Sequence, residues 1–310
     1  MNTDLPTTIP AYLDRLRRAL QGCDPALAQD ALYDAEDYLR SELAAHPDKS
    51  EAEVIASVAG SYGAPDEVAD IYRDTEVKVE RALRTPPPPA RRTWLGRFFG
   101  VVADPHAYGA LFYMLLSLVT GIFYFTWVVT GASLSVGLLI LIIGVPLLLL
   151  FLMSVRLLSL VEGRIVEALL GERMPRRPLY TNRSKPWLQR LKELFTDLRT
   201  WTAMLYFLLM MPLGTAYFAV VVTLVAMSLG FIAAPVLVWL GIADASVRSG
   251  GWQVLNYDGI GITTSIPAWG MPALLIAGLL LLFATLHLAR GIGRLHGLLA
   301  KHLLVREPVV

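Results

Sequence analysis

The chain has 310 residues, of which 55% are hydrophobic and only 17% are charged. This composition is too apolar for an ordinary soluble domain and indicates a membrane protein. The formal net charge of +1 conceals two regions of opposite sign: residues 1–83 carry 17 acidic and 8 basic side chains, and residues 84–310 carry 9 acidic and 19 basic ones. The acidic region lacks the clustered Lys and Arg that neutralise phosphates, so we expect no direct binding of nucleic acid.

Residues 1–83 are predicted to form an acidic cytoplasmic domain of four helices. Pro10 stands in the first turn of the first helix, and Asp24-Pro25 is a typical start for the second. Ser50-Glu51-Ala52-Glu53 is a capping box that opens the third helix, and the turn Gly63-Ala64-Pro65 opens the fourth. Five residues are predicted to organise this domain or to contact a partner protein: Tyr12, Leu16, Tyr38, Pro65 and Tyr72.

Several short motifs of this region are those of a known helical domain: Tyr12-Leu13 followed by Leu16 and Leu20, the acidic second helix ending at Tyr38-Leu39, Glu53-Val54-Ile55, and Gly63-x-Pro65-x-x-x-Ala69. The region resembles the HAAS-type helical signalling domain over about residues 9–75. The resemblance implies an intracellular signalling module of membrane proteins, whose genes often accompany those of PadR-type transcription regulators. The alternative is that the domain only folds and caps the membrane part.

Residues 84–92 read Arg-Thr-Pro-Pro-Pro-Pro-Ala-Arg-Arg and are predicted to form a stiff polyproline linker with a basic end. The segment also fits a PxxP ligand, although a spacer is the simpler role.

Four apolar stretches are each close to the ~20 residues that a helix needs to cross a bilayer. They cover residues 108–129, 134–155, 203–225 and 271–288. A fifth stretch, 227–241, is shorter and contains Gly230 and Pro235, which favours a re-entrant segment; a fifth complete span is the alternative.

The distribution of basic residues predicts the orientation. Residues 156–202 contain ten Lys or Arg and the tail 290–310 contains four, whereas residues 130–133 contain none and residues 244–269 contain only Arg248. By the positive-inside rule, both termini and the central loop are expected in the cytoplasm of a bacterial cell, with the chain spanning the inner membrane several times.

The two halves of the membrane part are similar in sequence. Trp94-Leu95-x-Arg97 recurs as Trp187-Leu188-x-Arg190, and the spacing from Arg156 to Gly163 equals that from Arg290 to Gly297. The sequence therefore predicts an all-α membrane protein built from a duplicated two-span unit, with repeat 1 at 93–178 and repeat 2 at 179–310.

The loop 244–270 is predicted to lie outside the cytoplasm and to form a small β-hairpin. Residues 252–257 alternate, Asp258-Gly259 is a type I′ turn signal, and residues 260–266 can pair back. Its candidate input or ligand residues are Trp252, Tyr257 and Asp258. A purely structural lid is the alternative.

Basic side chains at the cytoplasmic ends of the spans are predicted to lie at the inner interface: Arg156, Arg164, Arg290, Arg294 and His296. Arg156 and Arg164 are expected to form a salt-linked helix surface with Glu162 and Glu167. We find no metal-ligand spacing among the histidines, no phosphate-binding glycine loop and no nucleophile motif, so no metal, cofactor or catalytic residue is expected.

The membrane part is similar to the sensor domain of actinobacterial-type histidine kinases over about residues 93–305. The residues that carry this resemblance are Asp197-Leu198-Arg199-Thr200-Trp201, Leu205-Tyr206, Pro212-Leu213-Gly214, Ser228-Leu229-Gly230, Pro235 and, most specifically, the tail motif from Leu288 to Ala300. The family implies a four-span input module. No phosphoacceptor-histidine helix or ATP lid follows Arg306, so kinase activity is not expected to carry over.

Together these patterns predict a non-enzymatic membrane sensor that passes an envelope or lipid-phase signal to a cytoplasmic regulator. The alternative is a transporter subunit or a lipid-binding accessory protein, since duplicated units also occur in transporters. The lipid bilayer is the expected partner in both cases, and side-by-side packing of the spans fits a homo-oligomer.

Overall fold

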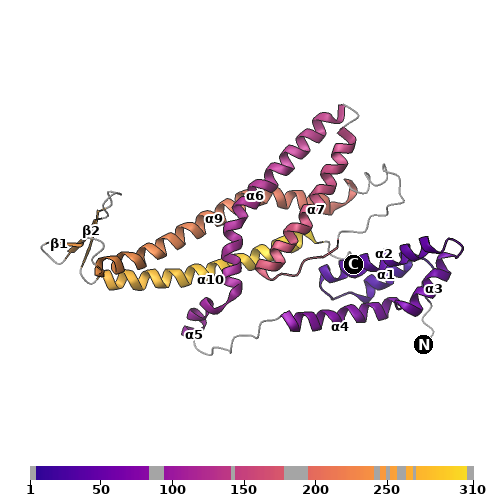
Figure 1. The fold of residues 1–310 in the computed structure, drawn as a ribbon, viewed down its shortest axis with the longest axis horizontal. Coiled ribbons are helices and arrows are strands. Elements are labelled where there is room, and N and C mark those ends of the chain that lie inside the picture. The colour runs from indigo at the N-terminus through magenta and orange to yellow at the C-terminus, as the bar shows by residue number, and fades with distance from the viewer. Residues whose placement is uncertain are drawn as a thin grey trace. The chain divides into compact units, whose positions relative to one another are not determined.

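The computed structural model describes residues 5–83, 94–140, 144–177, 195–240, 245–248, 252–256, 263–267 and 270–305, which are mostly helical (Figure 1). The predicted linker 84–92 lies outside these ranges. The chain divides into two compact units. The first unit contains Met1–Ala90, Phe125–Leu208 and Gly297–Val310; the second contains Arg91–Tyr124 and Leu209–His296. The boundaries of the predicted sequence repeats cut across these units, so the repeats stay a prediction.

The four helices predicted for residues 1–83, which we call the head, are present. They are α1 (Ile9–Ala19), α2 (Pro25–Ala45), α3 (Glu51–Ser61) and α4 (Pro65–Leu83). Local capping explains where three of them begin. The side chains of Thr8 and Asp24 accept hydrogen bonds from the first turns of α1 and α2. At α3, Ser50 and Glu53 make both reciprocal bonds of the capping box.

The head has its own apolar core, in which Tyr12, Leu16, Leu39 and Ile55 are fully buried. The Tyr12 hydroxyl donates a 2.8 Å hydrogen bond to the carbonyl of Gly63 and thereby joins α1 to the turn before α4. Gly63 has a φ of +114°, a conformation that favours glycine, so this turn depends on the residue type found there. Burial raises the pKa of Tyr12, which keeps the hydroxyl protonated as a donor.

Replacing Ser50 with alanine is expected to loosen α3. Loss of the N-cap side chain should speed amide exchange in the first turn of α3 about fivefold at neutral pH. The backbone amide and hydroxyl of Ser50 bond to the Glu53 carboxylate and hold its pKa below the usual value. A lowered pKa contributes stability that is present above the ordinary carboxyl pKa and is lost as pH falls through the lowered value, so the effect should shrink in acid.

Hydrogen exchange of the full-length protein, measured by mass spectrometry across this pH range, checks this expectation. Ser41→Ala is the matched control, because its hydroxyl bonds only to the Tyr38 carbonyl within α2. Equal exchange in α3 for both variants would contradict the prediction.

The membrane part contains four helical segments that are long and apolar enough to cross a bilayer: Pro105–Ile140, Gly144–Leu170, Leu198–Trp239 and Gly270–Leu304. They consist of α6 (Pro105–Gly137) with the short 3-10 helix η2 (Leu138–Ile140), α7 (Gly144–Leu170), α9 (Leu198–Trp239) and α10 (Gly270–Leu304). The number of candidate spans in the described ranges thus agrees with the four predicted from the sequence.

The first two spans meet later in the chain than predicted. The expected break at 130–133 lies inside α6, which continues to Gly137 before α7 begins at Gly144. A glycine costs a helix only about 1 kcal/mol relative to alanine, and unpaired backbone groups cost more in apolar surroundings. Gly131 also has a packing role, because a β-carbon at this position would overlap the ring of Phe151 in α7.

The stretch 227–241 does not form a separate re-entrant segment. It continues α9, a single helix of 42 residues that contains both Pro212 and Pro235. Proline removes one hydrogen bond and usually kinks a helix. The remaining intrahelical bonds keep the backbone satisfied in apolar surroundings, so the helix continues past Pro235.

In the second unit the short helix α5 (Trp94–Phe99) and the 3-10 helix η1 (Gly100–Ala103) pack against α10. The ring of Phe98 stacks on His287 with centroids 5.5 Å apart, and Val101 is buried against Leu286. Residues 94–103 therefore use part of their apolar surface for contact with a helix.

The loop between α9 and α10 contains a three-stranded antiparallel sheet in the order β1-β2-β3. Its strands are β1 (Ala245–Arg248), β2 (Trp252–Asn256) and β3 (Thr263–Pro267). Strand β1 was not predicted from the sequence. The register pairs Asn256 with Thr263, whereas a two-residue turn at Asp258-Gly259 would pair it with Gly261. The pairing is thus displaced by two residues from the one expected.

Candidate functional site: the contact of the acidic head with the segment after α7

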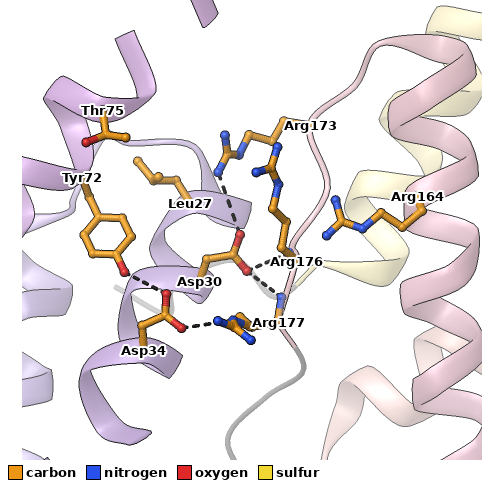
Figure 2. Close-up of a pocket in the computed structure, with 9 residues that line it drawn as sticks. All are labelled: Leu27, Asp30, Asp34, Tyr72, Thr75, Arg164, Arg173, Arg176 and Arg177. Carbon is orange, nitrogen blue, oxygen red and sulfur yellow. Dashed lines mark hydrogen bonds and ion pairs between the residues drawn. The ribbon is translucent and has the colours of Figure 1, made fainter. Parts of the chain in front are cut away.

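Within the first unit, the polar side of α2 is covered by residues 171–177, the segment that follows α7 (Figure 2). Asp30 is only 6% exposed, and its carboxylate accepts hydrogen bonds from the backbone amides of Arg176 and Arg177, at 2.7 and 2.8 Å. Two successive amides on one carboxylate make charge-assisted bonds, which are stronger than those to a neutral side chain.

Side chains on either side of Asp30 extend this contact. Asp34 pairs with the guanidinium of Arg177 at 3.1 Å and accepts a 2.9 Å hydrogen bond from the Tyr72 hydroxyl of α4. Burial raises the pKa of Tyr72, so the hydroxyl stays protonated and donates to Asp34. The head therefore meets the segment through two of its helices.

Gln29 contacts two separate parts of the first unit. Its amide nitrogen donates to the carbonyl of Arg177 at 2.7 Å, and its amide oxygen accepts from the Arg199 guanidinium of α9 at 2.7 Å. At the start of α2, the Lys301 ammonium in α10 lies 2.5 Å from a carboxylate oxygen of Asp24. Segments from three regions of the chain thus contact α2 or its N-cap.

The electrostatics of Asp30 combine opposing effects. Burial raises its pKa, whereas the amides of Arg177 and Arg176 and the charge of Arg173 lower it. The pKa of Asp30 is raised overall, because the cost of removing the carboxylate from water exceeds the stabilisation by its neighbours. The contact is therefore held by well-formed hydrogen bonds around a costly buried charge, and it is sensitive to the loss of any of them.

Contacts around α7 hold the segment in place. Arg156 pairs with Asp197 at 2.6 Å and thus joins α7 to the start of α9. Glu162 is fully buried and accepts a 2.9 Å hydrogen bond from Tyr206, so the prediction that it lies on a salt-linked surface is wrong. The hydrogen bond from Tyr206 holds Glu162 against α9.

A cavity of about 440 Å³ lies between α2, α4 and the end of α7. It is lined by Leu27, Asp30, Asp34, Tyr72, Thr75, Arg164, Arg173, Arg176 and Arg177, which Figure 2 shows as sticks. Within the described ranges, no group of three or more His, Cys, Asp or Glu side chains is arranged as metal ligands are.

The residues predicted to organise the head lie at its internal contacts. Tyr12 and Leu16 are in the core, and Pro65 is buried at the first position of α4. Tyr38 stacks on Tyr62 with ring centroids 4.8 Å apart. Of the five, only Tyr72 also lines the cavity. Any binding role for these residues stays a prediction.

The predicted interfacial basic residues have different surroundings. Arg156 and Arg164 belong to the first unit, where Arg164 pairs with Glu167 at 2.6 Å. In the second unit, Arg290 lies 3.0 Å from Asp104, and Arg294 is exposed.

His296 is buried within the protein, and its predicted position at the inner interface stays a prediction. It is 1% exposed and bonds to the hydroxyls of Tyr113 and Tyr217, at 2.7 and 3.3 Å. The prediction rested on its basic neighbours in the sequence, but helical geometry turns this position toward the tyrosines of α6 and α9.

The input candidates lie in or beside the sheet of the second unit. Trp252 begins β2, whereas Tyr257 and Asp258 lie outside the described residues. The role of these three residues stays a prediction.

No role in a head contact was predicted from the sequence for the residues that form it: Asp24, Gln29, Asp30, Arg176 and Arg177. One signal was present. Asp30 and Asp34 are four residues apart on one helix face, where like charges repel unless a partner covers them. The basic segment 173–177 is the partner that the structure supplies.

Two known family models match separate parts of the chain. The family model HAAS matches residues 11–71, which contain most of the head. The family model Sensor, described as "Putative sensor", matches residues 113–304. No curated protein and no solved structure matches the chain. The two families indicate a role in sensing and signalling at a membrane. Because the second match covers more than half of the chain, the protein belongs to the Sensor family, with a HAAS region at its N-terminus.

Proposed function

We propose that this protein is a non-enzymatic sensor of the bacterial inner membrane that passes an envelope or lipid-phase signal to a cytoplasmic transcription regulator, of the PadR type. In this proposal the head is the output domain, and its acidic α2 face is the surface that the signal covers or exposes. Both termini lie in the cytoplasm, in agreement with the basic residues of 156–202 and of the tail.

The contact between α2 and residues 176–177 is the single observation that carries the proposal. α7 ends at Leu170, and Gly171 follows with a φ of +76°, the usual conformation just after a helix. Only a few residues then separate the end of this candidate span from the amides that bond to Asp30. A shift or rotation of α7 therefore moves the segment that covers the head.

The outer loop 244–270 is the proposed input. A short sheet is stable only when it rests on other structure, so its position responds to whatever the adjoining helix ends contact. Trp252, Tyr257 and Asp258 are the side chains that we propose for ligand contact. α9 and α10 connect this loop to Arg199 and Lys301, which both bond to α2.

The side chains at the head contact support a role without catalysis. Gln29, Asp30 and Asp34 each bond to the segment or to α9, and Tyr72 bonds to Asp34. Groups held in this way serve to dock one part of the chain on another, and none forms a nucleophile and base pair.

We expect that the full-length protein, cross-linked in its native membrane and purified, recovers a soluble transcription regulator, and that a version lacking residues 1–83 does not. The reason is that the acidic head is the proposed output surface. Mass spectrometry of the recovered proteins makes the measurement. Recovery of the same transporter subunits or bound lipid with both versions, and of no regulator with either, would instead support the transporter or lipid-binding alternative.

A further inference from the structure

The cavity beside Asp30 has walls from two parts of the chain. Leu27, Asp30 and Asp34 of α2 and Tyr72 and Thr75 of α4 form the head side. The opposite side consists of arginines from α7 and the segment after it (Figure 2). The cavity exists only while the head is docked, and its volume of about 440 Å³ is in the range of small-molecule sites.

Three of the arginines, Arg164, Arg173 and Arg176, share two carboxylates. Arg164 and Arg176 both pair with Glu167, at 2.6 and 3.6 Å. Arg173 lies 3.9 Å from Asp30, whose carboxylate already accepts the two backbone amides. The described lining of the cavity has four arginines and two carboxylates, those of Asp30 and Asp34.

We propose that this cavity binds a phosphate-bearing anion, either a soluble phosphate compound or the headgroup of an anionic lipid. Guanidinium groups bind phosphate oxygens through paired N–H donors, and several arginines around one cavity give this recognition its strength. Thr75 also lines the head side of the cavity.

The ligand acts as a clamp on the docked state. A molecule that binds a cavity present in only one state shifts the equilibrium toward that state by mass action. The bound anion therefore keeps the head on the segment after α7, and its removal favours release. This inference rests on the proposed function, because docking of the head is the event that the anion controls.

The test uses the full-length protein in nanodiscs of phosphatidylcholine, with inorganic pyrophosphate as the soluble probe. A second set of nanodiscs contains phosphatidylglycerol. Calorimetry measures pyrophosphate binding, and hydrogen exchange of α2 and residues 172–177 measures docking. Pyrophosphate binding with increased protection in neutral nanodiscs supports a soluble ligand. Increased protection only in phosphatidylglycerol supports the lipid headgroup.

Arg164→Gln and Arg176→Gln test the site itself. Both side chains are nearly half exposed, so the fold should tolerate their loss. Each substitution should weaken anion binding about tenfold, the loss expected for one charge-assisted hydrogen bond. Arg40→Gln is the matched control, because Arg40 pairs with Glu36 within α2 and does not line the cavity. Equal affinity for all three variants would overturn the site.

Failure of the clamp and failure of the proposed function give different results. If neither anion changes protection while α2 stays protected in neutral nanodiscs, the anion site is wrong and docking stands. If the amides of α2 and residues 172–177 exchange without protection in every preparation, the head is not docked, and both the proposed function and the anion clamp are wrong.

Discussion

Replacing Asp30 with alanine is expected to release the head from the segment after α7. The substitution removes the carboxylate that accepts both amides, those of Arg176 and Arg177. Each hydrogen bond to a charged group contributes about 1.5–3 kcal/mol, so the loss of two shifts the docking equilibrium by about 3 kcal/mol or more. That change corresponds to more than a hundredfold in the ratio of docked to released protein, about tenfold for each 1.4 kcal/mol.

Hydrogen exchange of the full-length protein in nanodiscs measures this release. The amides of Arg176 and Arg177 and the exposed side of α2 should lose protection, while the core of the head around Tyr12 should not. Asp37→Ala is the matched control, since Asp37 is an exposed acid on the same helix. Asp30→Asn should fall between the two, because the amide oxygen still accepts but carries no charge. Unchanged protection in Asp30→Ala would show that these bonds do not hold the head.

Replacing Gly214 with alanine is expected to disrupt the packing of α6 against α9 in the second unit. A β-carbon at Gly214 would overlap the carbonyl group of Ser117, and one at Gly121 would overlap that of Met210. Both obstacles are backbone atoms, which no change of rotamer can move. Small residues at such crossings let helices approach closely in membranes, where this packing drives association. We expect alanine at Gly214 or at Gly121 to lower the free energy of unfolding by about 1–3 kcal/mol, as overpacking of a core typically does.

Thermal unfolding in detergent, monitored by size-exclusion chromatography, measures the change in melting temperature. Gly230→Ala provides the control on the same helix, because nothing lies within 4 Å of a β-carbon there. Alanine favours a helix over glycine by about 1 kcal/mol, so this control should leave the melting temperature unchanged or raise it. A fall of the same size in Gly214→Ala and Gly230→Ala would contradict the role of close packing.

The parts of the fold that could be predicted depend on neighbouring residues. Ser50 and Glu53 satisfy the start of α3 by themselves, and Pro65 sets the first turn of α4, so those helices begin where the sequence indicates. The number of candidate spans followed from apolar length alone. The same reasoning was wrong at 130–133 and 227–241, because a glycine or proline that ends a helix in water is tolerated where the backbone has no other partner.

Most of the candidate site could not be predicted, because its residues lie far apart in the chain. Asp30 bonds to amides almost 150 positions away, and Lys301 bonds to Asp24 across nearly the whole sequence. The sequence by itself determined the acidic head, the apolar helices and the excess of cations that follows them, since charge and hydropathy are properties of single residues and short windows. Only the tertiary structure decided which acids meet which cations, that Glu162 and His296 are buried, and that the arginines of 164–177 line a cavity beside α2. Such contacts arise from the packing of helices, and helix packing depends on residues far apart in the chain.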